Sequence, residues 1–169
     1  MTDHIAERVS AAREHLRQHP DAGRVEDTTV GVGRIDGLRV RAVDANGFSV
    51  EADMPVGIGG SLAAMTPGTL LRAALGTCDA TTLALEAAAR GIELSRLEVE
   101  VSSVSDDRGL LGFEGVQAGP EITRVRYRLA SADASEQELI SLVEYTERHS
   151  PVLSSLRDAT RVDVAIEIG

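Results

Sequence analysis

The sequence predicts an α+β fold, in which strands and helices are largely segregated along the chain. Two hairpin turn signals, Asp-Gly at 36–37 and Asn-Gly at 46–47, separate three short alternating segments. A long alanine-rich helix is expected over residues 67–90, and two further strands and a second helix follow it. This order favours α+β over a wound parallel sheet, in which strands and helices would alternate.

The first part of the chain predicts a helix, an N-terminal antiparallel meander and a loop. Residues 4–19 have apolar side chains at helical spacing, and Pro20 follows the end of this helix. The three meander strands are expected near 28–34, 37–44 and 47–53. The Gly-rich segment 54–65 is not a phosphate loop, because no Lys-Ser or Lys-Thr follows its glycines.

The long central helix over 67–90 has recognisable ends, because Thr66 can cap it, Pro67 fits its first turn and Gly91 stops it. The elements expected after it are strands at 95–105 and 121–130, a helix over 135–149 with a Ser135–Glu138 capping box, a short helix at 151–156 and a closing strand at 161–169. Segment 106–120 is Gly-rich but carries Leu110, Leu111 and Phe113, which predicts a buried contact such as one with a second subunit.

Composition limits the classes of partner and cofactor. A net charge of −10 and only 2% aromatic residues argue against a nucleic-acid surface, which needs basic and stacking side chains. No apolar run approaches the roughly 20 residues that span a bilayer, and the start lacks a signal-peptide core, so we expect no membrane association and a cytoplasmic location. His15 and His19 lie four residues apart without an evident third ligand, so we expect no metal site and no cofactor.

Cys78 is the only cysteine, and its position on the central helix allows two interpretations. Residues at spacings of three and four form one apolar stripe with it: Leu71, Leu75, Thr82, Leu85 and Ala89. Such a cysteine is either a small buried side chain or a reactive thiol. Gly76 makes the helix slim, which predicts that another element packs very close to it, and a second copy of the same helix would fit. Asp79 disfavours a thiolate unless it is turned away or neutralised by an arginine.

Four stretches in this order resemble the OsmC/Ohr superfamily, the osmotically inducible and organic-hydroperoxide-resistance proteins. They are DMPVGIGG at 53–60, TPGTLLRAALGTCDATTLALEAAARGIEL at 66–94, LEVEVSSVSDDRGLLG at 97–112 and SEQELISLVEYTERHSPVLSSL at 135–156. In the second stretch a proline precedes the cysteine by eleven residues, as in that family. The resemblance begins near residue 28, so residues 1–26 are interpreted as an N-terminal helical arm and 27–169 as the OsmC-like domain.

The resemblance implies an intertwined homodimer with two active sites at the subunit interface, each of which reduces organic hydroperoxides through a cysteine. The implied peroxidatic cysteine is Cys78, and the family's second cysteine falls on Ser150. The family's glutamate falls on Gly68 or Thr69, neither of which is acidic. Its arginine falls on Arg34, with Arg39 and Arg41 as alternatives.

Three functional hypotheses follow. The first is a one-cysteine peroxidase of weak activity in oxidative stress, with Cys78, Arg34 and Ser150 as candidate catalytic residues and His149 beside them. Its partners would be a second copy of the chain, an organic hydroperoxide and an external thiol reductant. The second is a family member without peroxidase activity, which binds a small apolar ligand in the dimer-interface cleft. The third is an interaction role for the N-terminal arm.

Overall fold

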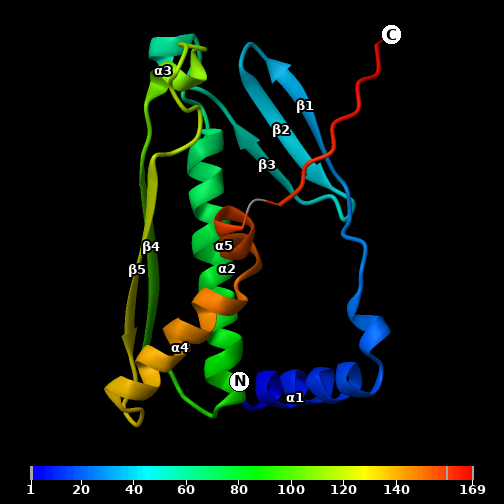
Figure 1. The fold of residues 1–169 in the computed structure, drawn as a ribbon, viewed down its shortest axis with the longest axis vertical. Coiled ribbons are helices and arrows are strands. Elements are labelled where there is room, and N and C mark those ends of the chain that lie inside the picture. The colour runs from blue at the N-terminus through cyan, green and yellow to red at the C-terminus, as the bar shows by residue number, and fades with distance from the viewer. Residues whose placement is uncertain (1, 159, 169) are drawn as a thin grey trace.

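A computed structural model of the chain describes residues 2–158 and 160–168 (Figure 1). Its elements in order are α1 (Thr2–Gln18), η1 (Pro20–Gly23), β1 (Val30–Asp36), β2 (Arg39–Asp44), β3 (Ser49–Ala52), η2 (Val56–Ile58), α2 (Pro67–Ala89), β4 (Arg96–Val104), α3 (Asp107–Leu110), β5 (Ile122–Ala130), α4 (Glu136–His149) and α5 (Pro151–Arg157). The predicted α+β class is confirmed. None of the described helices combines the length and apolar character that a membrane crossing requires.

The strands form two separate antiparallel sheets. The first is the predicted meander, in the order β1-β2-β3, and the second is the β4–β5 hairpin. Gly37 and Gly47 lie in the two meander turns with φ of 51° and 86°, a left-handed conformation that glycine adopts without strain. In the hairpin, Arg96 pairs with Ala130 at one end and Val104 with Ile122 at the other. Both sheets therefore contain the strands that the sequence predicts.

The central helix α2 has the ends that its sequence predicts. The Thr66 side chain accepts a hydrogen bond from the Thr69 backbone N–H, and Pro67 occupies the first turn. Past its C-terminal end, Gly91 has a φ of 70°. The predicted capping box is also present at α4, where the Ser135 and Glu138 side chains bond each other's backbone N–H groups.

The hydrophobic core lies between α2, α4 and the β4–β5 hairpin. Leu83, Ala87, Ile92 and Leu142 form its buried centre, and Tyr127 and Leu129 pack against it. Figure 1 shows the hairpin along one side of α2, with α4 crossing in front of the same helix. The meander sheet lies on the opposite side of α2 from the hairpin, so α2 connects the two sheets.

The Gly-rich loop between β3 and α2 closes around the buried carboxylate of Asp53. That carboxylate accepts hydrogen bonds from the backbone N–H groups of Met54, Ser61 and Ala63 and from the Ser61 hydroxyl. A Cβ at Gly60 would lie 1.9 Å from the carbonyl oxygen of Met54, so only glycine fits there. The loop thus fixes how the chain enters α2 from the meander.

The N-terminal helix α1 packs against α2 through only part of its length. Ile5, Ala6 and Val9 are half-buried, whereas residues 10–18 are exposed. Arg13 forms an ion pair with the buried Glu86 of α2 at 2.6 Å. Figure 1 shows α1 projecting sideways from the C-terminal end of α2.

The predicted closing strand is wrong for this chain. Residues 160–168 form no strand, and residue 169 lies outside the described residues. The alternation that predicted the strand is real, because Val162, Val164, Ile166 and Ile168 are spaced by two, but these side chains are 79–92% exposed. A strand needs a neighbouring strand to satisfy its backbone groups, and the described part of the chain provides none here.

The long segment 106–120 differs from its prediction in two ways. It begins with the short helix α3, which Asp106 caps by accepting a bond from the Arg108 N–H. Its three large apolar residues, Leu110, Leu111 and Phe113, are 55–58% exposed. The expected buried contact is therefore not made within the described chain, and a contact with a second subunit stays a prediction.

Candidate active site around Cys78

Cys78 lies in the middle of α2 and is half-buried. The apolar stripe on which it lies is only partly a core face, because Leu75 is 1% exposed but Leu71 and Leu85 are 41% and 46% exposed. The stripe that the helix buries throughout is spaced by four residues: Leu75, Asp79, Leu83 and Ala87. The interpretation of Cys78 as a fully buried core side chain is therefore wrong, and its thiol lies at the border between core and surface.

Gly76 has the close neighbour that its position predicts, and this neighbour belongs to the same chain. A Cβ at this position would lie 3.3 Å from Val101 Cγ2 of β4, which is tighter than ordinary contact. Glycine therefore lets α2 approach its own β4–β5 hairpin. The explanation by a second copy of the helix is not needed at this residue.

Ser150 is the hydrogen-bonding partner of the thiol. It lies between α4 and α5, is fully buried, and its backbone N–H bonds the Thr146 carbonyl oxygen. Its hydroxyl caps α5 by accepting a bond from Leu153 and donates to Cys78 Sγ at 3.4 Å. The fold thus brings together two of the predicted site residues, which are 72 positions apart in the sequence.

Asp79 is turned toward the hairpin rather than neutralised by an arginine. It is fully buried, and the Tyr127 hydroxyl of β5 donates to Asp79 Oδ2 at 2.6 Å. Its second oxygen, Oδ1, has no hydrogen-bond partner among the described residues. Burial, together with the hydrogen bond to Asp79, raises the pKa of Tyr127 above its ordinary value. Cys78 therefore has a buried carboxyl group as its immediate neighbour in sequence.

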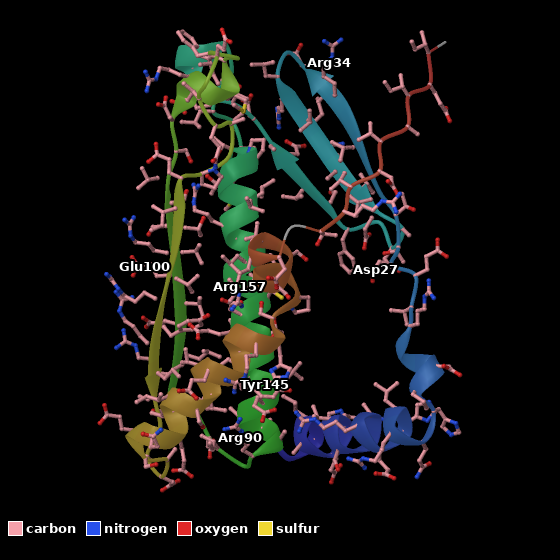
Figure 2. All side chains as sticks on the ribbon, in the orientation of Figure 1. Asp27, Arg34, Arg90, Glu100, Tyr145 and Arg157 are labelled. Atoms are coloured by element: carbon pink, nitrogen blue, oxygen red, sulfur yellow. The ribbon has the colours of Figure 1, made fainter. Side chains whose placement is uncertain are left out.

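The three arginines proposed for the site lie on the meander sheet. Arg39 and Arg41 both bind the Glu51 carboxylate, and these hydrogen bonds, that of Arg41 first, hold the pKa of Glu51 below its usual value. Arg34 is exposed and lies at the far end of the sheet from the middle of α2 (Figure 2). Among the described residues of one chain, no hydrogen bond joins any of these arginines to Cys78.

Two hollows flank the N-terminal half of α2. A small cavity of about 50 Å³ lies between α2, the β4–β5 hairpin and α5, with Leu71, Leu75 and Leu156 among its lining residues. A more open groove of about 430 Å³ lies between α2 and β4. Arg72 lines both hollows.

Arg72 and the burial of Asp79 and Glu86 were not predicted from the sequence. A signal was available, because these are the charged residues of α2 and they recur every seven positions along an otherwise uncharged helix. Such spacing places them on one helix face. Asp79 on that face meets the hairpin and Glu86 meets Arg13 of α1, so both carboxylates are buried, whereas Arg72 is half-buried beside the two hollows.

Comparison with known proteins assigns the family. The profile of the OsmC-like protein family matches residues 59–165, which is more than half of the chain. The chain belongs to the OsmC-like protein family. No curated protein matches the chain in sequence.

Solved structures of this family have the same fold. An OsmC-like protein from Mycoplasma pneumoniae aligns with a TM-score of 0.67 at 17% identity, over 80% of this chain and 91% of its own. An organic hydroperoxide resistance protein from Elizabethkingia anophelis gives 0.62 at 19% identity, over 80% and 93%. An OsmC-like protein of unknown function from Vibrio cholerae gives 0.61 at 12% identity, over 78% and 94%. At these sequence identities, the structural similarity shows a shared fold and nothing more.

Proposed function

We propose that this OsmC-like protein reduces organic hydroperoxides through Cys78, with an external thiol as reductant. The observation that carries the proposal is the contact between the half-buried Cys78 thiol and the buried Ser150 hydroxyl at 3.4 Å. A hydroxyl that donates to sulfur favours the thiolate, which is the reactive form of cysteine. The family assignment and its relatives named for hydroperoxide resistance support the same chemistry.

The reaction forms and breaks a small number of bonds. The Cys78 thiolate attacks one peroxide oxygen, so an S–O bond forms, the O–O bond breaks and the alcohol leaves after it takes a proton from solvent. An external thiol then attacks the oxidised sulfur, which releases water and leaves a mixed disulfide. A second external thiol restores Cys78 and departs as a disulfide. Because the chain has one cysteine, it cannot form an internal disulfide, and we expect slow turnover.

A second copy of the chain would complete this site. The meander sheet exposes Val30, Val32 and Ile35 on β1, and the unpaired C-terminal segment exposes four further aliphatic side chains. Exposed apolar surface of this kind is typical of interfaces between subunits. In such a homodimer, Arg34 of the partner subunit would be a candidate to approach Cys78. Sedimentation velocity of the full chain tests the assembly, and a monomer at micromolar concentration would contradict it.

Peroxide consumption tests the chemistry. The wild-type chain, incubated with an organic hydroperoxide and a small dithiol, should consume peroxide, and Cys78→Ser should lose all consumption above the buffer rate. Intact mass of the oxidised wild type, without reductant, should show one added oxygen atom. Equal consumption by wild type and Cys78→Ser would contradict the proposal.

Ser150→Cys provides a matched gain of function. The substitution places a second thiol at the position from which Ser150 now contacts Cys78. After peroxide treatment, this variant should carry an internal disulfide instead of a stable sulfenic acid, and its dithiol-dependent turnover should rise. An oxidised Ser150→Cys chain that still carries the added oxygen would show that the two positions do not resolve each other.

One observation favours a different function, binding of a small apolar ligand without turnover. Asp79 is buried directly beside Cys78, and a neighbouring carboxylate disfavours the thiolate. Under this alternative, Cys78 would line a cleft and remain a thiol. Dimedone, which traps sulfenic acid, should then fail to label the folded protein after peroxide treatment, while labelling would exclude the alternative.

A further inference from the structure

The Arg72 side chain is a half-buried cation that hydroxyl groups hold in place. Its Nη1 donates to Ser103 Oγ of β4 and its Nη2 donates to Thr69 Oγ1, both at 3.0 Å. The Thr69 hydroxyl is in turn 2.9 Å from that of Thr66. Among the described residues, no carboxylate lies within ion-pair distance of Arg72. The guanidinium is therefore oriented by neutral groups, and its charge is not neutralised by the chain.

The surroundings of Arg72 make an anion favourable. The guanidinium folds back over the first turn of α2, where a Cβ on Gly68 would lie 3.7 Å from Nη1. The N-terminus of a helix carries partial positive charge, which adds to that of Arg72 instead of offsetting it. A guanidinium presents five N–H donors, and the two bonds to Thr69 and Ser103 leave others for a ligand. A carboxylate matches this planar fork and can accept two bonds from it.

Arg72 also has an open approach. It lines the groove of about 430 Å³ between α2 and β4, which is large enough to admit a small ligand. Ala73, Gly76, Val99 and Val101 line the same groove, so an apolar body can lie there beside the guanidinium.

We infer that Arg72 is an anion-binding subsite, which takes the carboxylate of a small ligand whose apolar body lies in the groove between α2 and β4. Cys78 does not line this groove, so the inference goes beyond the proposed function and does not depend on it.

Calorimetric titration of the reduced full chain with hexanoate, and with the uncharged hexanamide, tests the subsite. Arg72→Gln should weaken hexanoate binding about tenfold or more, because it removes a charge-assisted hydrogen bond. Arg72→Lys should recover part of the affinity, since it keeps the charge without the fork. Hexanamide affinity should be the same in all variants. Arg148→Gln, an equal charge change at an exposed position of α4, is the matched control.

The outcomes separate this inference from the peroxidase proposal. Absence of hexanoate binding by the wild type, or equal hexanoate affinity in Arg72→Gln, would overturn the subsite even if Cys78 consumes peroxide. An equal loss of hexanoate and hexanamide binding would assign Arg72 a structural role and also overturn it. Selective loss of hexanoate binding establishes the subsite even if no hydroperoxide is turned over. If Arg72→Gln does not fold, the same comparison is made with Arg72→Lys, with the wild-type preference for hexanoate over hexanamide as the reference.

Discussion

The helical side of the molecule buries its large apolar side chains, whereas the meander sheet leaves its own exposed. Leu75, Leu83 and Leu142 on α2 and α4 are at most 1% exposed. On β1, by contrast, Val30, Val32 and Ile35 are 43–65% exposed. Both regions have apolar residues at the spacing of their secondary structure, so the difference lies in whether the same chain supplies a covering surface.

This contrast separates what one chain can stabilise from what needs a partner. The β4–β5 hairpin, α2 and α4 form a continuous core with charged groups on their outer faces. The meander has no layer over its apolar residues within the described chain. A sheet needs an apolar face packed on another layer. The proposed homodimer would supply that layer, and substitutions in the two regions distinguish them by experiment.

The largest expected effect is in the helical core. Leu83→Ala removes a fully buried side chain and should lower the free energy of unfolding by about 2–5 kcal/mol. Val56→Ala, at a position that is 71% exposed, is the control and should change it by less than about 0.5 kcal/mol. Urea unfolding followed by circular dichroism measures both. Similar losses in the two variants would contradict the location of the core.

In the exposed C-terminal segment, the expected effect depends on whether the protein forms a dimer. Val164→Ser and Ile166→Ser change side chains that are 82% and 80% exposed in one chain, so they should leave the unfolding of a monomer unchanged. If a second copy covers these side chains, each substitution removes about 1.5–3 kcal/mol of burial free energy from the interface. The dimer dissociation constant should then rise about tenfold or more. Sedimentation equilibrium measures that constant. No change in either variant would show that this segment lies outside the interface.

A smaller effect is expected where the N-terminal arm meets the core. Arg13 donates to Glu86 and to the Tyr145 hydroxyl, and Arg90 binds the same carboxylate and lies over the Tyr145 ring (Figure 2). Burial raises the pKa of Glu86, but the bonds from Arg90 and Arg13 outweigh it and keep the pKa below its ordinary value. Arg13→Gln should therefore lower the free energy of unfolding by only about 1 kcal/mol, because Arg90 still pairs with the Glu86 carboxylate.

Arg17→Gln is the matched control for the arm, since Arg17 pairs with Glu14 within α1 and contacts no other element through that bond. It should have a negligible effect on unfolding by urea. A double-mutant cycle of Arg13→Gln with Glu86→Gln should be non-additive. Additive losses would show that Arg13 does not stabilise the arm through Glu86.

A pH-dependent effect is expected in the loop that joins the meander to α2. The Ser61 hydroxyl, followed by the Ala63 N–H, holds the pKa of Asp53 at about 2, below its ordinary value. The folded pKa is depressed, so Asp53 stabilises the fold above about pH 4 and loses that contribution as the pH falls toward 2. The difference in urea midpoint between wild type and Asp53→Asn should shrink over this range. A constant difference would contradict the role of the carboxylate.

Most of the secondary structure could be predicted from local chemistry. The turns at Gly37 and Gly47, the capping box of α4 and the ends of α2 each depend on a few adjacent residues. The closing strand could not be predicted correctly in the same way. Its alternation is local, but its pairing depends on a neighbour that the described chain does not provide.

The candidate site was predicted only in part. The motif around Cys78 indicated the thiol, and the resemblance indicated Ser150 as its counterpart. The contact between Cys78 and Ser150 is formed by the packing of α2 against α4 and α5, across 72 positions of sequence. Arg72 was missed because its significance depends on the absence of a neutralising carboxylate, which is a property of its surroundings in space.

The sequence by itself thus determined the α+β order of elements, the helix ends, the turns and the identity of the thiol, because these follow from residues close together in the chain. Only the tertiary structure decided which face of α2 is buried, that Gly76 makes room for β4 and that Asp79 faces Tyr127. The physical reason is that burial and pairing are set by long-range contacts. Periodicity shows that a helix has an apolar stripe, but the neighbouring elements determine which stripe becomes the core.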